Sequence, residues 1–132
     1  MNIAVKETYQ DGQLIFQEGS FGEGTYVILS GKVKILKKVN NANVTVATLE
    51  KGDIFGELSF IDQGPRSASA VAVGDVQVGL LDKDILEDEV NKMSSDFRIV
   101  MKALTKRLRE TTSQLVNLTK EYHKLKGTIK QS

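Results

Sequence analysis

Residues 52–73 read GDIFGELSFIDQGPRSASAVAV, and the interpretation of the whole chain starts from this stretch. Strand-like apolar residues stand at both of its ends, whereas Phe55–Gln63 in the middle has the spacing of one or two helical turns. Gly64 followed by Pro65 is typical of a helix end, so we expect this helix to stop at Gly64. A short helix between strands is unusual, and such local exceptions often mark a functional site.

The same stretch contains residue types suited to binding an anion next to a hydroxyl group. Gly56 has no Cβ and lets a ligand approach the backbone, where the first N–H groups of the predicted helix are available to an anion. Arg66 offers a planar, bidentate partner for phosphate oxygens, and Ser67 adds a hydroxyl donor. Glu57 only accepts hydrogen bonds, so it suits a sugar hydroxyl. These residues together predict a site for a ribose phosphate.

Around this stretch, residues 3–81 show apolar and β-branched runs that recur every 8–12 residues and are separated by turn residues. This regular spacing predicts an antiparallel all-β sandwich or barrel. Asn40-Asn41 tolerates positive φ and predicts a hairpin. The expected strands are Ile3–Tyr9, Gln13–Gln17, Thr25–Ser30, Lys32–Val39, Val44–Leu49, Ala68–Val73 and Val76–Leu81.

The chain becomes helical from about Asp82, which we expect to cap a short helix through Val90; Ser94 or Ser95 then caps a long one. Apolar residues of the long helix follow one another at alternating steps of four and three over 33 residues. So strict a repeat predicts a coiled coil with a second copy of the chain, the alternative being that the helix packs on the β domain. The seam consists of Phe97, Met101, Leu104, Leu108, Thr111, Leu115, Leu118, Tyr122, Leu125 and Ile129.

Composition excludes several classes of protein. The 132 residues contain no cysteine, which excludes disulfides, thiolate catalysis and cysteine metal sites. A signal peptide and an apolar run of about 20 residues are also missing, so we expect a cytoplasmic protein that does not contact a membrane. One histidine, His123, is too few for a metal-binding β-roll enzyme, and no nucleophile–base or paired-carboxylate arrangement is found. We therefore expect no enzymatic activity.

The charge distribution suggests a boundary near residue 92. Residues 1–100 carry ten Lys/Arg and fifteen Asp/Glu, a balance of −5, whereas residues 101–132 carry eight and two, a balance of +6. We expect a β domain with its short helix over residues 1–92, a long helix over 93–127 and a tail over 128–132. The basic helix is interpreted as a solvated face, so direct binding to DNA is not expected.

The segment FGELSFIDQGPRSASAVA (55–72) resembles the phosphate-binding cassette of cyclic-nucleotide-binding domains. This family includes regulatory subunits of cAMP-dependent protein kinase, nucleotide-gated channels and bacterial catabolite activator proteins. The matching cassette residues are Phe55, Gly56, Glu57, Leu58, Pro65, Arg66, Ser67 and Ala68. The upstream matches are Phe16, Glu18-Gly19, Tyr26, Ile28, Gly31, Val33 and Gly52-Asp53, and the likeness covers residues 6–118.

The resemblance implies a mainly β fold with C-terminal helices: an antiparallel β-roll, or jelly-roll barrel, with a short cassette helix and a long dimerisation helix. It implies that Glu57 holds the ribose 2′-hydroxyl, Arg66 pairs with the exocyclic phosphate oxygens and Ser67 contacts phosphate or base. Residues 107–118 (RLRETTSQLVNL) are similar to the helix of the catabolite activators in which a Thr-Ser pair reaches the adenine, one residue from each subunit. The implied ligand-binding set is Gly56, Glu57, Leu58, Arg66, Ser67, Ala68, Thr111 and Thr112.

These implications lead us to expect a sensor for a cyclic nucleotide, with cAMP as the ligand and cGMP as the alternative. Binding is expected to alter the arrangement of the C-terminal helices in a homodimer, which a downstream protein then detects. Two alternatives stay open. One is a β-roll without a ligand that serves as a dimerisation or interaction module. The other is the sensory fragment of a transcription regulator without its DNA-binding domain, since the sequence stops at Ser132.

Overall fold

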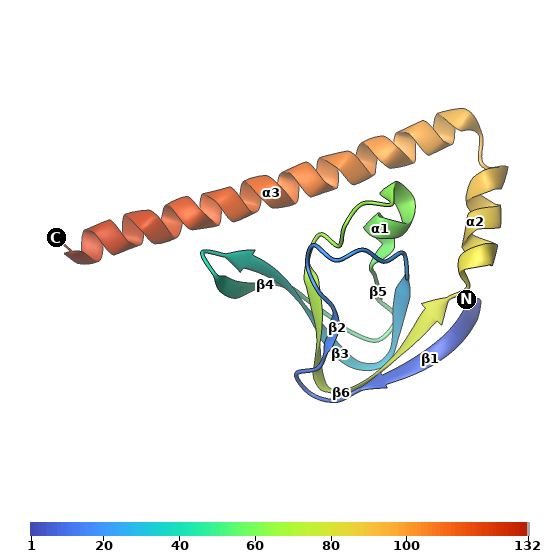
Figure 1. Ribbon diagram of the computed structural model, residues 1–132, viewed down its shortest axis with the longest axis horizontal. Coiled ribbons are helices and arrows are strands. Elements are labelled where there is room, and N and C mark those ends of the chain that lie inside the picture. Colours follow the sequence, from blue (N-terminus) through green and yellow to red (C-terminus); the bar gives the residue numbers. More distant parts are fainter. Residues whose placement is uncertain (132) are drawn as a thin grey trace.

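The computed structural model describes the backbone of residues 1–131 and the side chains of residues 1–127. A rolled β-sheet lies beneath one long helix (Figure 1), so the predicted β-roll with C-terminal helices is confirmed. The strands are β1 (Ile3–Tyr9), β2 (Leu14–Phe16), β3 (Tyr26–Val39), β4 (Ala42–Leu49), β5 (Ile54–Phe55) and β6 (Ser69–Leu81). The helices are α1 (Glu57–Asp62), α2 (Lys83–Lys92) and α3 (Ser95–Gln131).

The described strands form one antiparallel sheet in the order β1-β6-β3-β4, with β2 added to β6 and β5 added to β3. We expected four separate strands where the structure has two long ones, β3 and β6. Gly31 and Gly74 were interpreted as breaks, but both adopt positive φ (85° and 68°) and bend these strands without ending them. The two-residue strand β5 was not predicted because it is too short to show a pattern.

The core of the roll lies on the inner faces of β3 and β6, and three aromatic rings pack together there, one of them from the cassette. Tyr26 stacks on Phe55 with ring centroids 5.0 Å apart, and Phe16 lies 5.8 Å from both. Burying aromatic surface of this kind is a main source of stability in a small domain. The buried cluster comprises Tyr26, Ile28, Val33, Phe55, Ala70, Ala72, Val76 and Val78.

Several local predictions are confirmed. Asn40 and Asn41 have φ values of 52° and 65° in a hairpin whose flanking residues pair directly. Asp82 accepts a hydrogen bond from the Ile85 N–H at 3.1 Å and caps α2, and Ser94 accepts one from the Phe97 N–H at 3.2 Å at the start of α3. The backbone of α3 continues to Gln131, past the boundary expected at residue 127.

The end of the cassette helix differs from the expectation. Gln63, not Gly64, takes the left-handed conformation after α1, with φ 55°. Gly64 instead lies close to two side chains: a Cβ there would lie 3.1 Å from Asp62 Oδ1 and 3.2 Å from Arg109 Nη2 and would press on both. Its N–H also donates to Asp62 Oδ1 at 2.9 Å. This glycine therefore makes room for a contact between α1 and α3.

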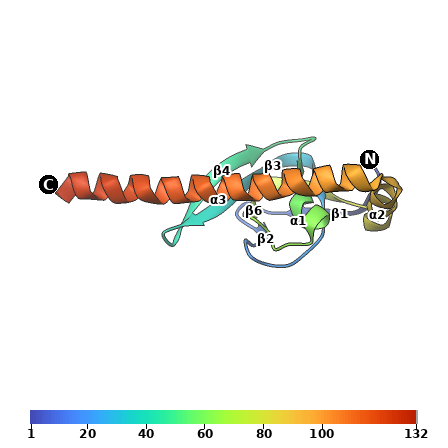
Figure 2. The same cartoon turned by 90° about the horizontal axis from the view of Figure 1, so that it is seen from above.

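Helix α3 lies along one side of the roll and passes over α1 (Figures 1 and 2). The face toward the roll carries Thr105, which is buried, and Thr112 and Thr119, which are half-buried. Each threonine hydroxyl donates to the carbonyl four residues earlier, which satisfies it inside the helix. None of the described helices is long and apolar enough to span a membrane.

The predicted heptad seam forms a second face of α3. At least half of the surface of seven seam residues is exposed, so this part of the seam does not pack on the roll. The side chain of Ile129 lies outside the described residues. The exposed seam residues are Phe97, Leu104, Leu108, Leu115, Leu118, Tyr122 and Leu125.

Gly31→Ala should destabilise the fold by about 3 kcal/mol, whereas Gly74→Ala should cost about 1 kcal/mol. Both glycines have positive φ, but a Cβ at Gly31 would collide with the Asp75 carbonyl and lie 3.0 Å from Val76 Cα, while nothing lies within 4 Å at Gly74. Urea denaturation followed by circular dichroism measures both free energies of unfolding. Equal losses in the two variants would show that the contact at Gly31 is unimportant.

Candidate functional site

Arg66 is a buried cation at the centre of the candidate site, with 5% of its surface exposed. Its Nη1 donates to the Gly56 carbonyl at 2.9 Å and its Nη2 to the Gly24 carbonyl at 3.0 Å. The guanidinium lies over the Phe16 ring, with Cζ 4.2 Å from the ring centroid. Within the described residues it pairs with no carboxylate, so a positive charge is buried without a counter-ion.

Burial lowers the pKa of Arg66 from its ordinary value, and the interaction with Tyr26 acts in the opposite direction. An arginine nevertheless stays protonated in a protein. These two hydrogen bonds engage two of its five N–H donors, and both acceptors are neutral carbonyls. A buried charge held in this way is costly, and an anion that reaches the remaining donors lowers that cost.

Glycines leave the space that the guanidinium occupies. Gly56 adopts a φ of 82°, and a Cβ there would lie 2.8 Å from both Arg66 Nη1 and the Gly24 carbonyl oxygen. A Cβ at Gly22 would lie 3.4 Å from Arg66 Nη2. We expected Gly56 to allow a ligand close to the backbone; in the structure it also allows the arginine itself to approach.

A pocket of about 220 Å³ opens between the cassette and the inner face of the sheet. Glu57, the first residue of α1, is half-buried at its edge and makes no hydrogen bond or ion pair with any described residue. The sequence placed six cassette residues in one site, and all six line this pocket: Gly56, Glu57, Leu58, Arg66, Ser67 and Ala68. The rest of the wall consists of Phe16, Ile35, Leu49, Ile54, Phe55 and Ser59.

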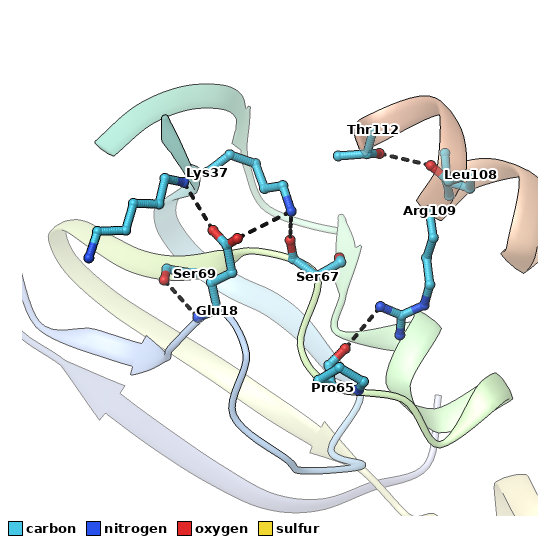
Figure 3. A network of polar contacts seen from close by, with 9 residues as sticks. Glu18, Lys37, Pro65, Ser67, Ser69, Leu108, Arg109 and Thr112 are labelled. Carbon is cyan, nitrogen blue, oxygen red and sulfur yellow. Dashed lines mark hydrogen bonds and ion pairs between the residues drawn. The ribbon is translucent and has the colours of Figure 1, made fainter. Parts of the chain in front are cut away.

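Neither predicted threonine lines the pocket. Thr112 is half-buried on the face of α3 that looks toward the roll, and its hydroxyl donates to the Leu108 carbonyl at 2.9 Å (Figure 3). Thr111 is exposed on the seam. The two neighbours therefore point to different sides of the helix, one toward this chain's own roll and one away from it.

An ion pair between α1 and α3 was missed by the sequence analysis. Arg109 on α3 donates from Nε and Nη2 to the two carboxylate oxygens of Asp62. Its Nη1 donates to the Pro65 carbonyl at 2.9 Å (Figure 3). Burial alone raises the pKa of Asp62, but hydrogen bonds from Arg109 and the Gly64 N–H together with the charge of Arg109 outweigh it and hold the pKa below its usual value. This clamp joins the cassette to the long helix.

A second cationic contact was also missed. Lys37 on β3 reaches the Ser67 carbonyl and the Glu18 carboxylate (Figure 3). In the sequence, Lys37 and Arg109 look like ordinary solvated charges. Their partners are distant along the chain: Ser67 is 30 positions from Lys37, and Asp62 is 47 positions from Arg109. No local pattern indicates such contacts.

A larger hollow of about 500 Å³ lies between α1, α2 and the start of α3. Its two cations, Arg98 and Lys102, are exposed and therefore already solvated. The smaller pocket is the candidate ligand site because Arg66, a buried cation without a carboxylate partner among the described residues, lines it.

Residues 6–92 match the family model described as cyclic nucleotide-binding domain. The CRP-like cAMP-activated global transcriptional regulator of Mycobacterium tuberculosis is 34% identical over 108 residues, which are 81% of this chain and 48% of the relative. The cyclic AMP receptor protein of Thermus thermophilus is 33% identical over 111 residues, with 83% and 51% covered. The chain thus spans about half the length of these curated relatives.

Solved structures resemble the chain in fold. The EAL enzyme Bd1971 in its cAMP-bound form superposes with a TM-score of 0.78 and 30% identity, covering 96% of this chain and 33% of that one. The catabolite activator protein of Thermus thermophilus superposes with a TM-score of 0.65 and 33% identity, with 87% and 55% covered. The first of these similarities includes α3 as well as the roll, since it extends over nearly the whole chain.

Asp62→Asn should lower the free energy of unfolding by on the order of 1 kcal/mol at pH 7, because it removes one charge of a partly exposed bidentate pair. The folded-state pKa of Asp62 is lowered, so this stabilisation is complete above the unfolded pKa of about 3.9 and is lost as the pH falls through the folded-state value. Urea denaturation at several pH values should show the wild-type advantage shrinking below about pH 3.9. Asp88→Asn, an exposed carboxylate on α2 without an ion pair in the described chain, is the control. A pH-independent difference would contradict the assignment.

Proposed function

The chain belongs to the cyclic nucleotide-binding domain family, and we propose that its pocket binds cAMP, with cGMP as the alternative ligand. The observation that carries the proposal is the buried guanidinium of Arg66, which has three N–H donors left and no carboxylate partner among the described residues. The phosphate of a cyclic nucleotide has one negative charge and two exocyclic oxygens, which match a planar, singly charged fork.

The other cassette residues suit the rest of a ribose phosphate. The half-buried carboxylate of Glu57 has no partner in the described chain and accepts the ribose 2′-hydroxyl in this proposal. Gly56, Leu58, Ser67 and Ala68 form the wall around the phosphate. The pocket of about 220 Å³ is small for a whole nucleotide, so we place the base along Ile35 and Leu49 with its outer edge toward α3.

Base contacts by Thr111 and Thr112 are part of the proposal. Thr112 looks toward the roll, so it suits the base bound in the same chain, whereas Thr111 lies on the seam and suits the base bound by a second copy. Two similar proteins are a cAMP-activated regulator and a cyclic AMP receptor protein, which supports cAMP as the ligand. The EAL enzyme Bd1971 has been solved in both a cAMP-bound and a cGMP-bound form. Titration with cAMP and with cGMP distinguishes the two bases.

We propose that the protein is a cytoplasmic sensor rather than an enzyme, and that α3 transmits the signal. Arg109 holds Asp62 and the Pro65 carbonyl, so a change in the cassette on binding reaches α3 directly. A ligand that contacts both elements favours the arrangement in which they lie close together. A downstream protein, or a further domain of a regulator twice this length, would then detect the change in α3.

The exposed seam supports a homodimer as the form in which α3 works. Its apolar side chains are at least half exposed in the single chain, and a second α3 would cover them. The alternative of a β-roll module without a ligand is less favourable. It would leave Arg66 buried without an anion and Glu57 without a donor.

Calorimetric titration with cAMP and cGMP tests the ligand. Arg66→Ala should weaken binding of the preferred nucleotide by roughly thirtyfold or more, since losing one partner of a buried charged pair costs about 2–5 kcal/mol. Arg98→Ala removes an exposed arginine outside the pocket and should change the affinity less than twofold. No binding of either nucleotide by wild-type protein freed of co-purified ligand would overturn the proposal and favour the ligandless module.

Sedimentation equilibrium tests the dimer. The wild-type protein should sediment at about twice the chain mass of 14.6 kDa, and Leu118→Lys should sediment at the single-chain mass because it places a charge in an apolar seam. Ser113→Lys adds the same charge at an exposed position off the seam and should leave the dimer intact. A wild-type protein of single-chain mass would contradict this arrangement.

A further inference from the structure

Like Arg109, Lys37 is a cation from outside the cassette that contacts it. The proposed function gives Lys37 no role. Its side chain is only 13% exposed, which is unusual for a lysine. The ammonium lies 3.3 Å from Glu18 Oε2 and also donates to the Ser67 carbonyl (Figure 3). Ser67 directly follows Arg66, so Lys37 holds the backbone next to the anion-binding guanidinium.

The strand geometry explains why Lys37 lies there. Side chains alternate along β3, so Lys37 is on the same face as Ile35, which forms part of the pocket wall. Pairing of Leu36 with Ser69 brings this end of β3 beside the residues that follow Arg66. An apolar residue at position 37 would continue the wall, whereas a lysine there has to find partners.

Glu18 fixes the ammonium from the other side. Its Oε1 accepts the Lys38 N–H at 3.0 Å, and its own N–H donates to Ser69 Oγ at 2.8 Å. The carboxylate is therefore tied to β3 and its backbone to β6, on both sides of the cassette segment. Lys37 lies between this anchored carboxylate and the Ser67 carbonyl.

We propose that Lys37 is a positioning residue for the anionic ligand: anchored by Glu18, it holds the Ser67 carbonyl and thereby locks residues 66–68 in the conformation that binds phosphate. The bond fixes the orientation of the Ser67–Ala68 peptide, since the peptide unit is planar. It thereby restrains the backbone at Ser67, from which the Ser67 hydroxyl leaves and which directly follows Arg66. This inference rests on the cyclic-nucleotide site proposed above.

A positioning role and a simple effect of charge predict opposite changes in ligand affinity for one variant, Glu18→Gln. Lys37→Met removes the cation and Glu18→Gln removes an anion, so a charge effect alone predicts opposite changes in affinity for an anionic ligand. Positioning predicts that both variants weaken binding, because each breaks the same chain of contacts.

Calorimetric titration of the full chain with cAMP and cGMP should give about tenfold weaker binding for Lys37→Met, as expected for a lost hydrogen bond to a charged group, and a smaller loss for Glu18→Gln. Lys38→Met is the matched control. Lys38 is the exposed neighbour of Lys37 and joins the contact with Glu18 only through its backbone N–H. The nucleotide affinity of Lys38→Met should therefore equal that of the wild-type protein. Amide hydrogen exchange without nucleotide should become faster at residues 66–69 in Lys37→Met.

The outcomes separate this inference from the proposed function. Wild-type affinity in Lys37→Met, or tighter binding by Glu18→Gln, would overturn the positioning role while Arg66→Ala still tests the site. If Lys37→Met does not fold by circular dichroism, the direction of the change in Glu18→Gln decides. Absence of nucleotide binding by the wild-type protein would overturn the proposed function itself.

Discussion

The burial of the Arg66 guanidinium is the constraint around which the surrounding loops are shaped. Its side chain donates to the Gly24 and Gly56 carbonyls, its N–H donates to the Ser20 carbonyl at 2.8 Å, and its carbonyl accepts the Gly19 N–H at 2.8 Å. One residue thus organises the loop between β2 and β3, the turn before α1 and the start of β6. Glycine is required at position 56, because a Cβ there would lie 2.8 Å from both this guanidinium and the Gly24 carbonyl oxygen.

The buried charge of Arg66 is only partly compensated within the described chain, and this leaves the roll suited to bind an anion. Carbonyl dipoles and the Phe16 ring offset part of the desolvation of Arg66, but no described carboxylate neutralises it. A carboxylate in this position would stabilise the ligand-free protein and compete with phosphate for the same donors. Binding of an anion instead stabilises the folded state by mass action, so the uncompensated charge links affinity to stability.

Patterns within a few residues could be predicted from the sequence, and contacts across the fold could not. The caps at Asp82 and Ser94 and the Asn40-Asn41 hairpin follow from local chemistry, and the resemblance to a known cassette implied the set of six residues that line the pocket. The continuity of β3 and β6 was missed because a glycine that bends a strand looks the same in sequence as one that ends it. The partners of Lys37 and Arg109 were missed because charged side chains at regular spacing resemble a solvated face until tertiary structure brings their partners close.

Three consecutive cassette residues are held in place, two of them by cations from other elements and Arg66 by carbonyls, and these contacts differ in strength. Lys37 on the extensively paired strand β3 holds the Ser67 carbonyl, and Arg66 itself is fixed inside the roll. Arg109 holds the Pro65 carbonyl from α3, through a pair whose side chains are 23% and 25% exposed. A partly exposed ion pair is weaker than a hydrogen-bonded sheet, so in the proposed coupling a displacement of the cassette on binding would move α3 more readily than β3. Under that proposal, this difference would direct the response of the site toward the helix that presents the exposed seam.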